Sequence, residues 1–195
     1  MPGDPKVWLI GETNPYQDDP EESIRYAMYP EPPESAGGRL CNLILGMTER
    51  DYLRSFERRN LLAGPWEGKG VTERARASAA CLSWEMNPGD QVLLLGAKVV
   101  GAFFPGEPWE AFACFHLPPG SGDPRGRGAE GHRGPFLHFA ALPHPSGLNR
   151  FWNDYQSYST VRAAVARLAP HLAPLLGKNP LTRGRVAAER EVSHG

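Results

Sequence analysis

The sequence predicts an α/β protein whose central, mostly parallel sheet of about four strands lies between two layers of helices. Three observations predict this class. Short apolar runs alternate with helix-type stretches along the chain. The 195 residues are 41% apolar and 22% charged, a balance that can form a core without disulfides or metals. Glycines or polar residues directly follow the apolar runs, as expected where strands reach the edge of a sheet.

The first third of the chain predicts one strand, one long loop and two short helices. Lys6–Ile10 is an apolar run that stops at a glycine and predicts the first strand. Pro15–Gly37 is rich in proline and acidic residues and is expected to be a loop. Apolar residues between positions 40 and 47 recur at helical spacing. Thr48, with Asp51 three residues later, predicts the capped start of another helix.

The middle of the chain predicts two strands, each followed by a helix. Phe56–Leu62 is expected to be a strand. Thr72–Met86 is alanine-rich, charged at its start and followed by Asn-Pro-Gly, which predicts a helix with a defined end. Gln91–Leu95 is an apolar run typical of a buried strand, and Ala97–Phe104 predicts the helix that follows it.

The last third predicts the end of the sheet and one further helix. Phe112–Leu117 is expected to be an extra strand and Phe136–Leu142 the last one. The loop Pro118–Pro135 between them is rich in glycine, arginine and proline. A helix is expected from about Ser159, because apolar residues recur on one helical face, and Pro170 should kink it.

Composition excludes several classes of protein. No apolar run approaches the ~18–20 residues of a membrane span, and the N-terminus lacks the basic and apolar regions of a signal peptide. Three widely spaced cysteines without Cys-x-x-Cys argue against a disulfide framework and favour the cytoplasm. A net charge of −1 excludes a strongly basic coat for nucleic acid but allows a local basic patch. One domain over residues 1–177 and a polar, basic tail over 178–195 are the expected organisation.

Polar residues follow the predicted strands at the points where a parallel sheet places its site. Glu12 and Asn14 follow the first strand, Asn60 lies near the end of the second, and His144 follows the last. In open α/β sheets, ligands bind beyond the carboxyl ends of the strands. The sequence therefore predicts an active site at this edge. Prolines on both sides of His144 limit its backbone freedom, which suits a preorganised hydrogen-bond donor.

Taken singly, each of these features has an ordinary alternative. The loop of His144 could be a simple strand-to-helix turn, and Asn14-Pro-Tyr a type I turn. Glu12 could be a solvated acid and Asn60 a strand end. Gly126–Gly131 matches a dinucleotide fingerprint but follows no predicted strand, so it is expected in a loop whose arginines either touch phosphates or are solvated.

Four segments, taken in order, resemble the uracil-DNA glycosylase superfamily. Pro143–Arg150, which contains His-Pro-Ser-Gly-Leu-x-Arg, is similar to the second motif of that superfamily, most closely to its mismatch-specific uracil/thymine branch. Gly11–Tyr16 is similar to the first motif as a mosaic of several branches. Asn60 falls where the family places its base-recognition asparagine, and Gln91–Lys98 resembles the strand and Leu-Gly turn before a family helix.

The resemblance implies a DNA base-excision glycosylase with a uracil-DNA glycosylase-like fold. Such an enzyme flips uracil, or a related deaminated or modified base, out of the stack and hydrolyses its N-glycosidic bond, leaving an abasic site. His144 would donate to the departing base, and either Asn14 or Glu12 would position the water. Asn60 would pair with the edge of the base. Tyr16 would exclude the methyl group of thymine.

The remaining implied roles concern stacking and the DNA strand. Tyr29 would stack on the flipped base, with Tyr26 as the second candidate. Leu148 would fill the vacated stack, while Ser146 and Arg150 would hold phosphates. The expected DNA-binding loop consists of Ser146, Gly147, Leu148, Asn149 and Arg150.

The first motif departs from the family pattern. It has one extra residue between its glycine and Asn-Pro, and Asn14 stands where one branch has a catalytic aspartate. The iron–sulfur cysteines of another branch are missing. We therefore expect a monomer without cofactor, metal or cluster, whose partner is DNA containing uracil or a modified base. Two alternatives remain open: a non-catalytic relative that senses modified or abasic DNA, and an N-glycosidase for a free nucleoside or nucleotide.

Overall fold

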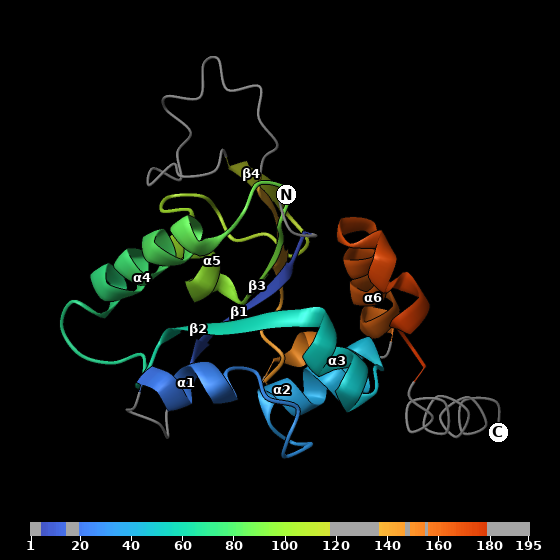
Figure 1. The fold of residues 1–195 in the computed structure, drawn as a ribbon. Coiled ribbons are helices and arrows are strands. Elements are labelled where there is room, and N and C mark those ends of the chain that lie inside the picture. The colour runs from blue at the N-terminus through green and yellow to red at the C-terminus, as the bar shows by residue number, and fades with distance from the viewer. Residues whose placement is uncertain (1–4, 15–19, 118–136, 147–148, 155, 179–195) are drawn as a thin grey trace. The chain divides into compact units, whose positions relative to one another are not determined.

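The computed structural model describes residues 5–14, 20–117, 137–146, 149–154 and 156–178 (Figure 1). The chain forms two compact units. Unit 1 comprises Met1–Met28 and Phe56–His144, and unit 2 comprises Tyr29–Ser55 and Pro145–Gly195. This division leaves the expected single domain over residues 1–177 as a prediction. Residues 179–195 of the expected tail lie outside the described residues.

Unit 1 contains a five-stranded sheet with the order β2-β1-β3-β5-β4. The first four strands in this order are parallel, and β4 pairs with β5 in the antiparallel sense at one edge. The predictions of an α/β protein and a mostly parallel sheet are thus confirmed, with one strand more than expected. The strands are β1 (Val7–Thr13), β2 (Phe56–Leu62), β3 (Gln91–Leu95), β4 (Cys114–Leu117) and β5 (Leu137–Leu142).

β1 is longer than its apolar run. The sequence predicted an end at Ile10, but Gly11 pairs with Asn60 and Thr13 pairs with Leu62, so the ladder with β2 continues to Thr13. Backbone pairing does not require apolar side chains, which is why the hydrophobic pattern ended too early. Glu12 consequently lies on the strand rather than in a loop.

Helices α4 (Val71–Glu85) and α5 (Ala97–Phe103) lie side by side and cover one face of this sheet (Figure 1). Both confirm predicted helices. Ala75 and Ala79 are buried in the core cluster of this face, and their small side chains allow α4 to approach the strands. Alternate strand residues such as Leu9 point to the opposite face and are also fully buried, as expected for parallel strands.

Asp90, which is 1% exposed, stabilises the amino edge of the sheet, where the amino ends of the parallel strands lie. Its Oδ1 accepts a hydrogen bond from the backbone N–H of Lys6 at 2.8 Å. Its Oδ2 accepts from Trp8 Nε1 at 2.8 Å and from the backbone N–H of Asn87 at 3.0 Å. A buried carboxylate is stable here because donors from β1 and from the turn before β3 surround it.

Unit 2 begins with a helix that changes its winding along its length. Gly38 is the last residue of the α-helical part, and its position is so crowded by the backbone of Pro30–Pro33 that a Cβ atom would not fit. The helix ends at Gly46, which has a φ of 61°. The helices of unit 2 are α2 (Ala36–Gly38), the π-helix η1 (Arg39–Leu45), α3 (Glu49–Ser55), η2 (Arg150–Asn153), α6 (Gln156–Leu168) and η3 (Pro170–Leu175).

Arg162 of α6 fastens the end of η1. Its Nε donates to the carbonyl of Ile44 at 2.7 Å, and one of its terminal nitrogens donates to the carbonyl of Leu43 at 2.8 Å. The carbonyls of the last helical turn have no partner within a helix, so an arginine is well suited to satisfy them.

Three details of the sequence prediction are corrected. The expected loop over Pro15–Gly37 contains a helix, α1 (Pro20–Tyr26), and also the start of the helix that continues into η1. Pro170 does not kink α6 but begins the separate 3-10 helix η3, because its ring cannot continue the α-helix. The extra strand starts at Cys114, since Phe112 adopts a positive φ of 68°.

Within the described part of the chain, no helix has the length and apolar character needed to span a bilayer.

Candidate functional site

The end of β2 presents an asparagine side chain to the end of β1. Asn60 pairs with Gly11 in the ladder, and an added Cβ on Gly11 would lie 2.5 Å from Asn60 Oδ1 and 3.1 Å from the sulfur of Met28. The absence of a side chain at Gly11 is therefore what allows the Asn60 amide to lie against the backbone of β1. Within the described residues, Asn60 Oδ1 is buried and has no hydrogen-bond partner.

The end of β3 brings a carboxylate and an imidazole together. Gly96 follows β3 with a φ of 98°, and its N–H donates to the carbonyl of Leu142 on β5 at 2.8 Å. An added Cβ on Gly96 would lie 3.1 Å from His144 Cβ and 3.2 Å from Glu12 Oε1. Both side chains thus pack against the same glycine, so Glu12 of β1 and His144, two residues after β5, are neighbours.

Lys98 lies in the first turn of α5 and forms an ion pair with Glu12, with Nζ 3.2 Å from Oε2. The Glu12 side chain is 19% exposed and the Lys98 side chain 53% exposed. The ammonium group also lies 5.3 Å from the ring centre of Trp66, which follows β2. The carboxylate of Glu12 is therefore held next to His144 by a cation from a third segment.

The environment of His144 lowers its pKa below the usual histidine value. Partial burial is the main cause, because it penalises the charged imidazolium. The carboxylate of Glu12 opposes this effect, and the ammonium of Lys98 adds to it. A neutral imidazole is thereby favoured at neutral pH. Such a ring can donate one hydrogen bond to a developing anion without itself carrying a charge.

The arrangement places three functional groups on the carboxyl side of the sheet in unit 1. They are a buried amide oxygen on β2, a fixed carboxylate on β1 and a mostly neutral imidazole after β5. An amide can read the edge of a polar heterocycle, a carboxylate can take a proton from water, and an imidazole can stabilise a leaving anion. The structure brings Glu12 and His144 together at Gly96, whereas Asn60 lies against Gly11, the residue before Glu12 on β1. Because successive side chains of a strand point to opposite faces, Asn60 and Glu12 share the carboxyl edge of the sheet but leave it on different faces.

The other predicted residues of the first motif are only partly placed. Asn14 directly follows β1, is half-buried and takes part in a polar or electrostatic interaction. Tyr16 lies outside the described residues. Tyr29 belongs to unit 2, where its carbonyl accepts a hydrogen bond from Ser35 Oγ at 3.4 Å. Tyr26, the second stacking candidate, is on α1 in unit 1, with the Arg25 guanidinium 5.4 Å from its ring centre.

The loop predicted to bind DNA begins at the boundary between the units. Pro145 is the first residue of this part of unit 2, and its carbonyl accepts a hydrogen bond from Arg39 Nε at 3.1 Å. Asn149 Oδ1 accepts from the N–H of Phe151 at 3.1 Å and caps η2, so this side chain has a structural role. Ser146 is half-buried and Arg150 is exposed. The predicted loop residues outside the described ranges are Gly147 and Leu148.

Two residues of the site were not given a role from sequence. Lys98 was only part of the Leu-Gly turn, and Gly96 only the end of a strand. The signal for Gly96 was its position directly after a buried strand, where a glycine often allows close approach or a positive φ. Lys98 carried no sequence signal, because its partner Glu12 is 86 residues away.

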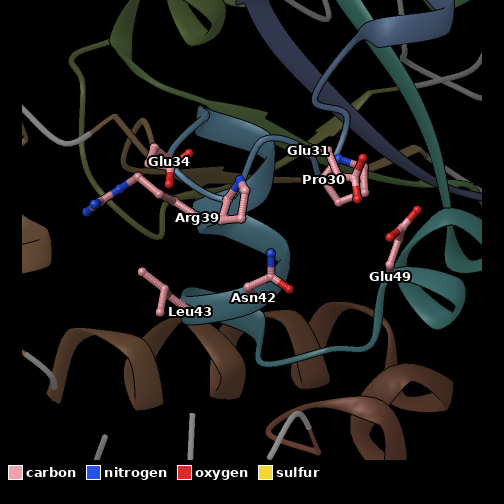
Figure 2. Close-up of a pocket in the computed structure, with 8 residues that line it drawn as sticks. Pro30, Glu31, Glu34, Arg39, Asn42, Leu43 and Glu49 are labelled. Atoms are coloured by element: carbon pink, nitrogen blue, oxygen red, sulfur yellow. The ribbon is translucent and has the colours of Figure 1, made fainter. Parts of the chain in front are cut away.

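Unit 2 contains a separate cavity with a volume of about 530 Å³ (Figure 2). Figure 2 shows Asn42 and Leu43 projecting from η1, with Pro30 and Glu31 on the loop opposite them. Its carboxylates outnumber its single cationic side chain, Arg39, so the lining does not suit a phosphate. The lining residues are Pro30, Glu31, Pro33, Glu34, Arg39, Asn42, Leu43 and Glu49.

No metal centre is formed by the described residues, since they contain no group of three or more His, Cys, Asp or Glu side chains that could hold an ion. Cys41 is buried in η1, and burial together with Glu49 raises the pKa of its thiol to about 12, which favours the neutral, less nucleophilic thiol. The glycine pattern over Gly126–Gly131 and its neighbouring arginines lie outside the described residues.

Comparisons with known proteins found no match: no protein-family model, no curated protein and no solved structure is similar to this chain.

Proposed function

We propose that this protein is a DNA glycosylase that hydrolyses the N-glycosidic bond of a flipped uracil, or of a related deaminated or modified base, and leaves an abasic site. The observation that supports it best is the packing of Glu12 and His144 against Gly96. Glu12 lies on β1, and Asn60 lies on β2, the strand that pairs with β1. These are the same residues that the resemblance to the uracil-DNA glycosylase superfamily assigns to water activation, leaving-group stabilisation and base recognition.

Base recognition is assigned to Asn60. Its buried Oδ1 has no partner among the described residues, and a buried acceptor without a donor is unfavourable. A ring N–H of a flipped pyrimidine would supply the missing donor, and the amide N–H₂ would donate to a neighbouring carbonyl of the same base. A site that hydrogen-bonds its ligand in this way discriminates strongly against bases that lack the matching group.

Bond cleavage is assigned to His144 and Glu12. The bond between the sugar carbon and the base nitrogen breaks, and its electron pair leaves with the base. His144 donates a hydrogen bond to the oxygen on which the negative charge of the base develops. The oxygen of a water molecule bonds to the sugar carbon, and the Glu12 carboxylate accepts the proton that this water loses. Asn14, which follows Glu12 by two residues, remains the alternative group for positioning the water.

DNA binding is assigned to the loop after His144. Ser146 and Arg150 would contact phosphates, and Leu148 would fill the space that the flipped nucleotide leaves. Tyr29 or Tyr26 would stack on the base. This assignment rests on the sequence motif.

The proposal is tested with end-labelled oligonucleotides that contain one uracil, in single- and double-stranded form, followed by alkali and separation of the strands. We expect cleavage at the uracil, slowed roughly 10²–10³-fold in His144→Ala, as for loss of one donor to a developing anion. His171→Ala, which removes an exposed histidine on η3, is the matched control and should cleave at the wild-type rate.

Each other outcome points to a different function. Release of uracil from deoxyuridine monophosphate but not from the oligonucleotide would favour an N-glycosidase for free nucleotides. Tight binding to uracil-containing or abasic DNA without release of any base, over a panel of modified bases, would favour a non-catalytic sensor. Equal cleavage by the wild type and His144→Ala would contradict the assigned role of His144.

A further inference from the structure

Lys98 makes two contacts that converge on the candidate site from different segments. Its ammonium lies 3.2 Å from Glu12 Oε2 on β1 and 5.3 Å from the ring centre of Trp66, in the segment after β2. The Trp66 ring is partly buried against the core of the sheet, so it forms a fixed surface for the cation. The Lys98 side chain is thus restrained from two sides.

The position of Lys98 is unfavourable for the helix that carries it. It is the second residue of α5, and the amino end of a helix carries partial positive charge, which disfavours a cation. The ion pair does not compensate through stability, because a pair with a half-exposed partner contributes at most about 1 kcal/mol. A role in arranging the site explains this lysine better than a role in folding.

Glu12 needs such an arrangement if it is to act on water. A glutamate side chain has three rotatable bonds, and a carboxylate at the edge of a sheet could adopt several rotamers. In the structure, one oxygen of Glu12 faces Lys98 and the other packs against Gly96 beside His144. The ammonium therefore fixes which way the carboxylate points.

We propose that Lys98, seated on the ring of Trp66, is a positioning residue that holds the Glu12 carboxylate in place beside His144. The effect of Lys98 on base excision rests on the proposed glycosylase activity. The effect of Lys98 on the arrangement of Glu12 and His144 is independent of that activity, since the arrangement exists in the protein without DNA. These two effects can be measured separately.

The first measurement is an NMR titration of the His144 imidazole in a double-mutant cycle. The charged groups that act on this ring within the described residues are Glu12 and Lys98. Glu12→Gln removes a negative charge and should lower the pKa of His144. If Lys98 holds Glu12 in place, the same substitution should lower this pKa less in a Lys98→Met background, and Lys98→Arg should restore the full effect. An equal or larger decrease in the Lys98→Met background would overturn the proposal.

The second measurement is the rate of excision. Misplacing a catalytic group by about 1 Å can cost up to about 100-fold, so Lys98→Met should reduce kcat about 10–100-fold with little change in KM, and Lys98→Arg should recover most of it. If Lys98→Met raises KM and leaves kcat at the wild-type value, the positioning role is overturned. If the wild type excises no base, the glycosylase proposal fails while the titration still decides the role of Lys98.

Lys6 is the matched control for both measurements. Its side chain is also 53% exposed, its ammonium lies 4.0 Å from Glu57 and 5.6 Å from the ring centre of Trp8, and it stands at the amino end of β1. Lys6→Met removes the same kinds of contact. It should leave both the titration of His144 and the rate of excision unchanged.

Discussion

Asp90 and Asn60 lie at the amino and carboxyl ends of the strands of one sheet, and their side-chain oxygens differ in hydrogen bonding. Asp90 is buried, and its two oxygens accept three hydrogen bonds from Lys6, Trp8 and Asn87. Asn60 also has a buried oxygen, but no donor among the described residues reaches it. The hydrogen bonds of Asp90 therefore join the segments of β1 and β3 at the amino edge, whereas the carboxyl edge has a buried acceptor without a donor among the described residues.

The comparison teaches that burial alone does not distinguish structure from function. A buried polar group with its partners in place stabilises the fold, and one without them is stabilised only by something that binds. Gln91, at the start of β3, also has a buried oxygen without a partner among the described residues. Gln91 lies at the amino end of β3, at the opposite edge of the sheet from Glu12, His144 and Lys98, so we expect no functional role for it.

The largest expected effect is on stability at the amino edge. Asp90→Ala leaves one buried donor and two partly buried donors without an acceptor and should lower the free energy of unfolding by about 3–5 kcal/mol. Unfolding in urea, followed by circular dichroism, measures the change. If the free energy of unfolding of this variant falls by less than about 1 kcal/mol, Asp90 does not stabilise the amino edge and the comparison is contradicted.

The next effect concerns the space that Asn60 occupies. Gly11→Ala adds a Cβ 2.5 Å from Asn60 Oδ1, so the amide must shift. We expect a loss of about 1–3 kcal/mol in the free energy of unfolding and a strong loss of excision. Gly101→Ala in α5 is the control, because nothing lies within 4 Å of its added Cβ. That substitution should instead stabilise the helix by about 0.5–1 kcal/mol, and a similar loss in both variants would contradict the argument.

A smaller effect of opposite sign is expected at Asn60 itself. Asn60→Leu keeps the size of the side chain and removes the unpartnered oxygen. The free energy of unfolding should stay unchanged or rise by up to about 1 kcal/mol, while excision is lost. Gln91→Leu should have the same effect on stability but should leave excision intact. Loss of stability in Asn60→Leu would show that the amide has a structural partner.

The smallest effect is a dependence of stability on pH. Burial lowers the pKa of His144 below the value of about 6.5 in an unfolded chain. Just below that pH the unfolded chain binds a proton that the native chain does not, so the free energy of unfolding falls as the pH drops. Urea unfolding at neutral pH and below pH 6.5 should show a smaller fall for His144→Gln than for the wild type. His171→Gln, at an exposed position, should keep the wild-type dependence.

Most of the sheet could be predicted because buried strands are apolar and short. The bounds of Phe56–Leu62 and Gln91–Leu95 agree with the structure. The helix α1 was missed because its proline and acidic residues were interpreted as loop composition. A proline at the first helical position, followed by Glu21 and Glu22 in the first turn, is in fact a favourable start for a helix.

The candidate site could be predicted only in part. The rule that parallel strands gather their ends at one edge correctly brought Glu12 and His144 together. No local pattern could indicate that Lys98 contacts both Glu12 and Trp66, since such contacts depend on how distant segments pack. The π-helical winding of Arg39–Leu45 was likewise not visible in a spacing that also fits an α-helix.

The central place of β1 has a consequence for how the protein is made. Val7 pairs with Phe56 on one side and with Gln91 on the other, although β1 precedes both of these strands in the chain. At about 5–20 residues per second, the 84 residues from Trp8 to Gln91 take roughly 4–17 s to synthesise. During that interval an apolar strand destined for the middle of the sheet has an unpaired edge. Until β3 is synthesised, this edge of β1 is therefore open to pairing with strands of other chains.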